Sequence, residues 1–331
     1  MTRKTKETKE TRKRWLFLGW SYSRRSEDIA IIMGIEYFYF PLSQRIRFFQ
    51  FPLLFIKTLL FLSKKRPEVI FIQHPPVHAI LPVFLHCLFT KTQFIIDSHI
   101  IPGTTITEKP HHHIYLLLHR FYSYYAAVTL FHSDVILKRF KRWRCRCMVL
   151  ENPVRNLEIK GNFPVRERPA VGMVSSFSPD EHILDVIESA KKLKDVYFYI
   201  TGKKNKIPPG LVKSAAENIC FTGYIKGDDY YEFLKSMDTV IVLTDREESA
   251  LLGAYETISC GTPLVLSDTW IMRYYFPIGA IFVENRKEAI GKGIRKALEE
   301  NEKLRREMRE LKGEKIEKQA ENFLRIKNLT S

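Results

Sequence analysis

The chain has 331 residues, of which 45% are hydrophobic, and its 53 Lys and Arg against 37 Asp and Glu give a formal net charge of +16. The hydrophobic content excludes a disordered chain, and the length favours two domains, each with its own core. The basic excess favours a polyanionic partner: nucleic acid, an anionic membrane or a phosphate-bearing substrate. Charge alone does not separate these three classes.

The cysteines and the N-terminal segment favour a cytoplasmic protein without a structural metal. The cysteines lack the paired spacing of a metal site. In the segment Arg-Cys-Arg-Cys at 144–147, the two arginines make a bound metal cation unfavourable. Reduced thiols are therefore expected at Cys87, Cys145, Cys147, Cys220 and Cys260. The first fourteen residues carry seven Lys or Arg and two acids, with no adequate apolar segment directly after them. We expect a disordered basic arm at 1–14.

Strand and helix patterns alternate through the first half of the chain. Strands are expected at 15–19, 36–40, 68–73, 93–97 and 127–131, and residues 149–153 close the half. Between them, helices are expected at 26–33, 45–66, 77–89 and 113–127, with Ser26 as the cap of the first and a loop at 98–112.

The same alternation restarts at residue 170. Strands are expected at 170–174, 196–200, 219–223, 239–243 and 263–266, and helices at 183–193, 228–236 and 249–260. Short apolar runs alternating with helices predict parallel sheets covered on both faces. We therefore expect two doubly wound α/β domains, at 15–160 and 165–285, followed by charged helices at 286–331. Ligands should bind in the loops after the strands.

The segment 45–66 is basic, aromatic and apolar. Gln50, Pro52 and Lys57 interrupt it, and it falls short of the roughly 20 apolar residues of a spanning helix. One reading is an amphipathic helix in the interface of an anionic membrane, which would make the protein peripheral on the inner face of the cell membrane. The other is an ordinary helix packed on a sheet with a solvated basic face.

The segment 246–268 carries the strongest signal of chemistry. Glu248 precedes an expected helix start at Ser249, and Glu256 lies two turns along that helix among apolar residues. The first N–H groups of the helix, at 250–253, suit phosphate or sugar oxygens. A carboxylate among apolar neighbours needs partners, and sugar hydroxyls are good ones.

This segment resembles the family 4 (group 1) retaining glycosyltransferases. Their hallmark is a glutamate, seven residues and a second glutamate, running into Ala/Ser-Cys-Gly-Thr-Pro-Val-Val. This chain has Glu248, seven residues and Glu256, followed by Ser-Cys-Gly-Thr-Pro-Leu-Val at 259–265. The resemblance implies the GT-B fold, with two Rossmann-like domains facing each other across a cleft. It implies a hexosyl- or glycosyltransferase that uses a nucleotide-sugar donor with retention, and no cofactor or metal. Glu256 would bind the donor ribose and Glu248 the donor sugar, unless the pair is incidental.

Further landmarks match the same family. Gly223 and Tyr224 look like the loop whose backbone meets the nucleobase, and Lys203 and Lys204 look like the loop beside the diphosphate, or are simply solvated lysines. Leu251, Leu252 and Gly253 would complete the donor site with Ser249. Asp97 and His99 resemble an Asp-x-His turn whose histidine reaches the donor sugar, the alternative being a loop histidine bonded to a carbonyl. The acceptor side would hold Gly19, Trp20, Arg24, Arg25 and His74.

One departure from the family concerns the loop after the strand at 170–174. Ser176 and Glu181 stand where the family places an arginine and a lysine that neutralise the leaving diphosphate. The change resembles a subgroup with Ser-Phe-x-x-Asp-Glu and Asp-x-His signatures. The neutralising charge would then come from elsewhere, the candidates being Lys203, Lys204, Arg246, Arg24 and Arg25.

The predicted function is sugar transfer to a lipid-linked, polysaccharide or other glycan acceptor. Rival predictions are a sugar-nucleotide epimerase of the same fold and a non-catalytic GT-B scaffold. A nucleic-acid partner is not expected, because the aromatic residues lie in apolar runs rather than among basic residues on exposed strands.

Overall fold

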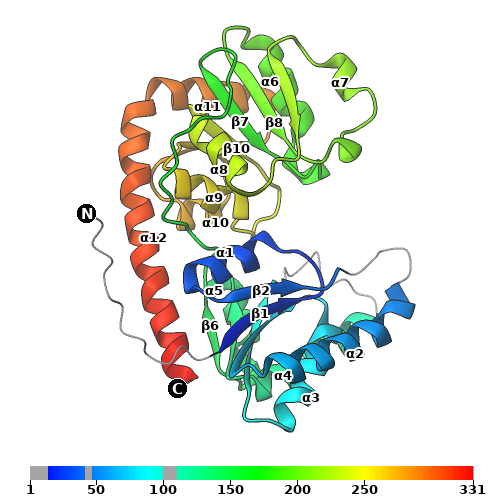
Figure 1. The fold of residues 1–331 in the computed structure, drawn as a ribbon. Helices are drawn as coiled ribbons and strands as arrows, with labels where there is room; N and C mark the ends of the chain where they lie inside the picture. The colour runs from blue at the N-terminus through cyan, green and yellow to red at the C-terminus, as the bar shows by residue number, and fades with distance from the viewer. Residues whose placement is uncertain (1–13, 42–46, 100–109, 331) are drawn as a thin grey trace, which may run out of the picture. The chain divides into compact units, whose positions relative to one another are not determined.

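A computed structural model describes residues 14–41, 47–99 and 110–330 (Figure 1). The basic arm predicted at 1–14, except Arg14, and most of the loop predicted at 98–112 lie outside these residues. The chain divides into unit 1, Met1–Glu151 with Glu321–Ser331, and unit 2, Asn152–Ala320. Within the described residues, no helix combines the length and the apolar character needed to cross a membrane.

Unit 1 contains a six-stranded parallel sheet in the order β2-β1-β3-β4-β5-β6. Its strands are β1 (Trp15–Gly19), β2 (Glu36–Tyr39), β3 (Val69–His74), β4 (Gln93–Ser98), β5 (Val128–Phe131) and β6 (Cys147–Val149). Its helices are α1 (Arg24–Met33), α2 (Arg47–Lys65), α3 (Ile80–Leu88), α4 (Pro110–Tyr125) and α5 (Asp134–Phe140), with short 3-10 turns η2 (Val77–Ala79) and η3 (Lys141–Trp143).

The helices of unit 1 cover both faces of this sheet. Successive residues of a strand point to opposite faces, so each strand contributes side chains to two cores. Leu18 and Ile70 face a core formed with α2, α3 and α4. Phe17 and Phe71 face the other core, formed with α1 and residues 323–326 of α12. The final turns of α12 (Asn301–Leu329) therefore complete the core of unit 1.

Helix α1 begins earlier than the sequence predicted. Ser23, not Ser26, is its N-cap, because the Ser23 hydroxyl accepts from the Ser26 backbone N–H at 3.2 Å. The earlier start places Arg25 in the first turn of the helix, beside the strand ends.

Unit 2 contains a second six-stranded parallel sheet, in the order β12-β11-β10-β7-β8-β9. The strands are β7 (Ala170–Val174), β8 (Tyr197–Thr201), β9 (Ile219–Gly223), β10 (Thr239–Val242), β11 (Leu264–Ser267) and β12 (Ala280–Val283). The helices are α6 (Ile183–Lys192), α7 (Leu211–Ser214), α8 (Gly227–Ser236), α9 (Leu252–Cys260), α10 (Trp270–Tyr275) and α11 (Lys287–Glu299), with η4 (Pro179–Glu181) and η5 (Lys204–Lys206). The two parallel sheets confirm the predicted doubly wound class.

Helix α9 begins at Leu252, three residues later than predicted. Ser249 donates its backbone N–H to the carbonyl of Arg246 at 3.2 Å, and Leu251 is an extended N-cap with φ −70° and ψ 135°. The residues from 244 to 251 are therefore a loop that leads into the helix.

Glycines in α11 give a matched pair for testing the packing of unit 2. A Cβ on Gly293 would overlap Val283 Cγ1, whereas a Cβ on Gly291 would meet nothing closer than Ser189 Cβ at 3.8 Å. We expect Gly291→Ala to raise the free energy of unfolding by about 0.5–1 kcal/mol through helix propensity. Gly293→Ala should lower it by about 1–3 kcal/mol, because the stiff valine cannot move aside. Urea denaturation of both variants measures this, and equal effects would contradict the close packing.

Buried histidines make unit 1 sensitive to acid. His119 is fully buried, stacks on His74 with ring centroids 4.1 Å apart, and has no hydrogen-bond partner on either ring nitrogen among the described residues. Burial lowers the pKa of His119 to about 3. Below about pH 6.5, His119 is protonated in the unfolded chain but stays neutral in the folded chain, so the free energy of unfolding falls as the pH falls.

We therefore expect His119→Phe to protect the protein at pH 5. A histidine that stays neutral when folded costs about 2 kcal/mol of stability at that pH, and phenylalanine removes this cost in an aromatic site lined by Phe140 and Trp143. Urea denaturation at pH 7 and pH 5 measures the difference. His113→Phe, at an exposed position of the same helix, is the control, and an identical loss in wild type and His119→Phe would contradict the argument.

Candidate functional site

In unit 1 the strand order reverses between β1 and β3, which is where open parallel sheets bind ligands. At this point Gln73 donates from Nε2 to the Ser21 hydroxyl at 2.9 Å. A Cβ on Gly19 would lie 2.6 Å from Gln73 Oε1, so the absence of a side chain at Gly19 permits the close approach.

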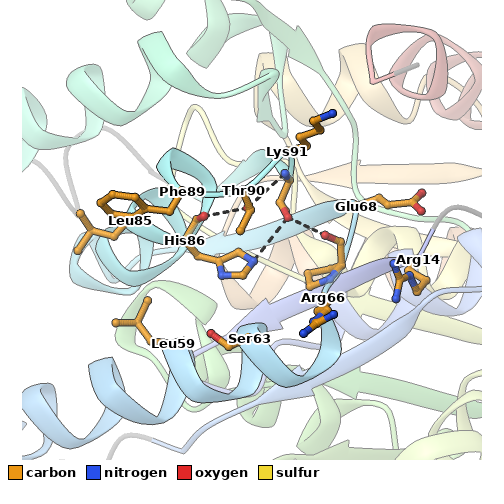
Figure 2. Close-up of a pocket in the computed structure, with 12 residues that line it drawn as sticks. Arg14, Leu59, Ser63, Arg66, Glu68, Leu85, His86, Phe89, Thr90 and Lys91 are labelled. Atoms are coloured by element: carbon orange, nitrogen blue, oxygen red, sulfur yellow. Dashed lines mark hydrogen bonds between the residues drawn. The ribbon is translucent and has the colours of Figure 1, made fainter.

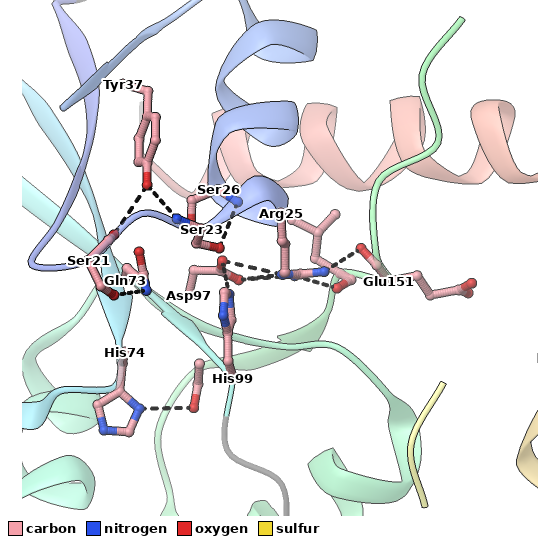
Figure 3. Close-up of polar contacts among 12 residues, drawn as sticks. Ser21, Ser23, Arg25, Ser26, Tyr37, Gln73, His74, Asp97, His99 and Glu151 are labelled. Carbon is pink, nitrogen blue, oxygen red and sulfur yellow. Dashed lines mark hydrogen bonds and ion pairs between the residues drawn. The ribbon is translucent and has the colours of Figure 1, made fainter. Parts of the chain in front are cut away.

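A buried ion network lies at the carboxyl end of β4 (Figure 3). The Asp97 carboxylate is fully buried; Arg25 Nη2 donates to its Oδ1 at 3.0 Å, and His99 Nε2 lies 2.6 Å from its Oδ2. The Arg25 guanidinium also donates to the backbone carbonyls of Glu151 at 2.9 Å and Leu150 at 2.8 Å. The start of α1, the end of β4 and the segment after β6 thus converge on one carboxylate.

The charges in this network fix the state of the carboxylate. Burial alone would raise the pKa of Asp97, but Arg25 and His99 outweigh it and hold that pKa well below its usual range. Burial, and then the charge of Arg25, lower the pKa of nearby His132 to about 3, so this histidine is neutral. A histidine held by an ionised carboxylate has a fixed ring, an arrangement that orients an imidazole toward a reacting group.

Two residues predicted on the acceptor side do not reach the solvent. Trp20 is 1% exposed and donates its indole N–H to Thr58 of α2 at 3.0 Å. His74 is 0% exposed and stacks on His119 of α4. Helices of unit 1 therefore cover both side chains, and the placement of their loops on the acceptor side stays a prediction. Arg24 is half-buried.

In unit 2 the strand order reverses between β7 and β10. The first turn of α9 lies over these two strand ends, since a Cβ on Gly253 would be 3.2 Å from Val174 Cγ1 and 3.6 Å from Val242 Cγ1. The backbone N–H groups of this turn, at Leu252 and Gly253, have no acceptor within the helix. They form a ready anion site at the topological switch point.

Glu256 lies one turn further along α9 and is 4% exposed. Tyr230, a buried residue of α8, donates its hydroxyl to Glu256 Oε2 at 2.7 Å. A buried carboxylate has capacity for further donors, such as the hydroxyls of a ribose. Glu248 is half-buried in the loop before α9, and Ser249 is buried.

The ends of β8 and β9 lie side by side and carry the predicted lysines. Lys203 Nζ lies 5.8 Å from the ring centroid of Tyr224, which is 43% exposed. Lys204 runs beside Gly223, where a Cβ would be 3.0 Å from Lys204 Cε. Gly223 has φ 83°, a left-handed conformation that glycine adopts without strain. The structure therefore brings these four residues together.

The acids after β7 are bound within their own loop. The Glu181 carboxylate accepts from the Ser175 and Ser176 hydroxyls, each at 2.6 Å, and from the Ser176 backbone N–H at 2.8 Å. Asp180 pairs with Arg246, whose Nε is 3.1 Å from Asp180 Oδ2. Burial opposes ionisation of Asp180, but hydrogen bonds and Arg246 lower its pKa. Glu181 is thus an anion bound by hydrogen bonds from within its own loop.

Sequence reasoning missed several of these partners. Tyr230 and Ser175 had no motif that pointed to them, and His132 lay in a short strand end without a signature. Arg25 was considered as an acceptor-side residue and as a cation for the diphosphate, and its contacts with Asp97 were not foreseen. In the described parts of the chain, no group of three or more His, Cys, Asp or Glu could hold a metal ion.

Comparison with known protein families finds a match within unit 2. Residues 154–314 match the model of the family described as "Glycosyl transferases group 1". Among curated proteins, none matches the chain in sequence.

Solved structures show the same fold over nearly the whole chain. Sucrose-phosphate synthase from Thermosynechococcus elongatus is similar with 13% identity and a TM-score of 0.70, over 96% of this chain and 100% of that one. HepE from Anabaena in complex with UDP-glucose is similar with 12% identity and a TM-score of 0.67, over 95% and 99%. A glycosyltransferase from Rickettsia africae has 12% identity and a TM-score of 0.64, over 95% and 89%. Unit 2 therefore matches the group 1 glycosyltransferase family over residues 154–314, and the two doubly wound parallel sheets give the chain the GT-B fold of the solved structures.

Proposed function

We propose that this enzyme transfers a sugar from a nucleotide-sugar donor, bound by unit 2, to a glycan or lipid-linked acceptor. The observation that carries the proposal is the buried carboxylate of Glu256, one turn below a helix start that lies over the strand switch point. The structure of HepE holds UDP-glucose, which makes a uridine nucleotide the first donor to test.

Each part of the donor has a candidate partner in unit 2. The nucleobase would meet the backbone at Gly223 and Tyr224, and the ribose would bind Glu256. The diphosphate would lie against the first turn of α9, at Leu251, Leu252 and Gly253 with Ser249, where helix N–H groups favour negative charge.

The leaving diphosphate also needs positive charge, because negative charge builds on it as the sugar departs. Lys203 and Lys204, at the end of β8, and Arg246, in the loop before α9, are the candidates. Asp180 fixes the position of the Arg246 guanidinium, so it takes part as an oriented donor. Ser176 and Glu181 form the wall of the site at the end of β7 and add no cation.

The donor sugar would be contacted by Glu248 and by His99. The ionised Asp97 fixes the His99 ring through Nε2, and Arg25 stabilises that carboxylate. Retention of the anomeric configuration, which the family resemblance implies, stays a prediction that the coupling constant of the product's anomeric proton tests. Transfer without an added metal is likewise a prediction.

We expect Glu256→Gln to weaken UDP binding roughly ten- to a hundredfold, because a hydrogen bond to a charged group contributes about 1.5–3 kcal/mol. The amide keeps the size of the side chain and can still accept from Tyr230, so the fold is retained. Isothermal titration of UDP measures the affinity, and a thermal-shift screen of other nucleotides names the base. Glu247→Gln, at an exposed position in the same loop, is the control.

Unchanged UDP affinity in Glu256→Gln would reject Glu256 as the ribose ligand. If no nucleotide or nucleotide sugar raises the unfolding temperature of the wild type, the donor assignment itself fails and the scaffold alternative is favoured.

We expect His99→Ala to slow release of the nucleotide from the bound nucleotide sugar by roughly 10²–10⁴-fold, the range for loss of a positioned acid–base group. Hydrolysis of the donor, with water as acceptor, is the assay, since it needs no acceptor glycan. UDP affinity should not change, because the nucleotide contacts lie in unit 2. The unfolding temperature of the variant should equal that of the wild type, because His99 is partly exposed and the Arg25–Asp97 ion pair remains.

Arg25→Met is the contrasting variant. It leaves Asp97 as a buried charge without its main counter-ion and should cost about 3–5 kcal/mol of stability. Normal hydrolysis by His99→Ala would exclude the catalytic role, and recovery of an epimerised sugar without transfer would favour the epimerase alternative.

A further inference from the structure

Helix α2 carries an exposed apolar stripe. Leu53, Ile56 and Leu60 are 68%, 53% and 67% exposed, and their spacing places them on one side of the helix. Lys57 and Lys64 fall on the same side by that spacing and are also exposed. The opposite side, with Leu54 and Leu62, packs into the core. The outer side of α2 therefore combines leucine and isoleucine with lysine.

Helix α4 repeats this arrangement. Ile114, Leu117 and Phe121 are 62%, 63% and 46% exposed along one side, while His119 and Tyr122 face inward. Arg120 is exposed beside this stripe. A helix whose outer side is apolar is not the usual design for a surface helix facing water.

Helix α3 lies between α2 and α4, so the three helices form one surface (Figure 1). On one side, Phe84 of α3 contacts Phe121 and Tyr125 of α4, with ring centroids 5.5 and 5.2 Å apart. On the other, the ring of Phe51 in α2 lies 4.6 Å from that of His78, just before α3. Phe89, at the end of α3, is 87% exposed. We call this surface the α2–α3–α4 face.

The apolar residues are concentrated rather than scattered. Of the 22 exposed large hydrophobic residues in the described chain, 12 lie between Leu53 and Tyr125 on these helices or at their ends. Single exposed apolar residues are normal on any surface, but a gathered set marks a contact with a protein or a membrane.

The charge of the α2–α3–α4 face decides between these partners. The three helices contain no Asp or Glu, and their exposed charged residues include Lys57, Lys64 and Arg120. A pocket of about 730 Å³ between the C-terminal ends of α2 and α3 adds Arg14, Arg66 and Lys91 beside apolar side chains, with Glu68 as its one acid (Figure 2). A second copy of this chain would bring like charges together, whereas an anionic lipid surface would neutralise them.

We propose that the α2–α3–α4 face docks on an anionic lipid bilayer, with the apolar stripes in the acyl boundary and the Lys and Arg at the phosphates. The pocket between α2 and α3 receives a lipid headgroup phosphate. In this proposal the binding is interfacial, because the apolar side chains lie on the outer sides of amphipathic helices. This inference extends the proposed function, since it brings the enzyme to lipid-linked acceptors, but it does not depend on donor binding.

The test is co-sedimentation of the full chain with vesicles. Vesicles of mixed phosphatidylglycerol and phosphatidylcholine should bind the protein, vesicles of phosphatidylcholine alone should not, and added salt should weaken binding. Leu60→Glu, Phe89→Glu and Leu117→Glu should each reduce binding, and all three positions are exposed enough to leave the core intact. Ile31→Glu, at a 52% exposed position of α1 on the other face of the sheet, should bind as wild type.

Two double variants that each remove two positive charges test whether binding depends on the lysines of α2 or only on the net charge of the protein. Lys57→Gln with Lys64→Gln should weaken vesicle binding roughly 25-fold, since each lysine near an anionic surface contributes on the order of fivefold. Lys292→Gln with Lys296→Gln removes the same charge from α11 and should change binding little.

Three outcomes would overturn the proposal: no binding to anionic vesicles, an equal loss in Ile31→Glu, or a wild-type dimer in solution that Leu117→Glu dissociates. UDP titration of the same variants stays unchanged if the donor site is independent. Loss of vesicle binding with intact UDP affinity, or the reverse, therefore tells apart the two proposals.

Discussion

The buried ion pair between Arg25 and Asp97 is the interaction on which the strand ends of unit 1 depend. Removing two charges from water is costly, and the cost is offset only when geometry and further hydrogen bonds are good. Here the guanidinium also satisfies two backbone carbonyls, at 150 and 151, so it joins α1, β4 and the segment after β6. The same carboxylate fixes His99. Stability and the orientation of a candidate catalytic group therefore share one contact.

Much of the fold could be predicted because parallel strands buried on both faces appear as short apolar runs. The strands at 15–19, 170–174 and 219–223 were placed correctly on this basis. Helix starts were less predictable. Ser26 was expected to cap α1 and Ser249 to begin α9, but Ser23 caps α1, and a loop turn at Ser249 delays the start of α9 to Leu252. A local sequence pattern cannot choose between neighbouring serines when tertiary contacts decide.

The candidate site was predictable where one loop carries its residues. Asp97 and His99 are two positions apart at a strand end, and they pair as that spacing permits. The partners from distant segments were not predictable: Arg25 is 72 positions from Asp97, and Tyr230 is 26 positions from Glu256. The role of Glu181 was also open from the sequence, and its bonds to Ser175 and Ser176 make the loop after β7 self-contained.

Helix α12 has a consequence for how the chain folds during synthesis. Its first part belongs to unit 2, while Phe323 and Ile326 fill the core of unit 1 beside Phe17 and Ile29. Domains usually fold as they leave the ribosome, the N-terminal one first. Unit 1 cannot follow that order to completion, since part of its core is translated more than 300 residues after Phe17. One face of the unit 1 sheet therefore stays incompletely covered until unit 2 and the end of α12 have been synthesised.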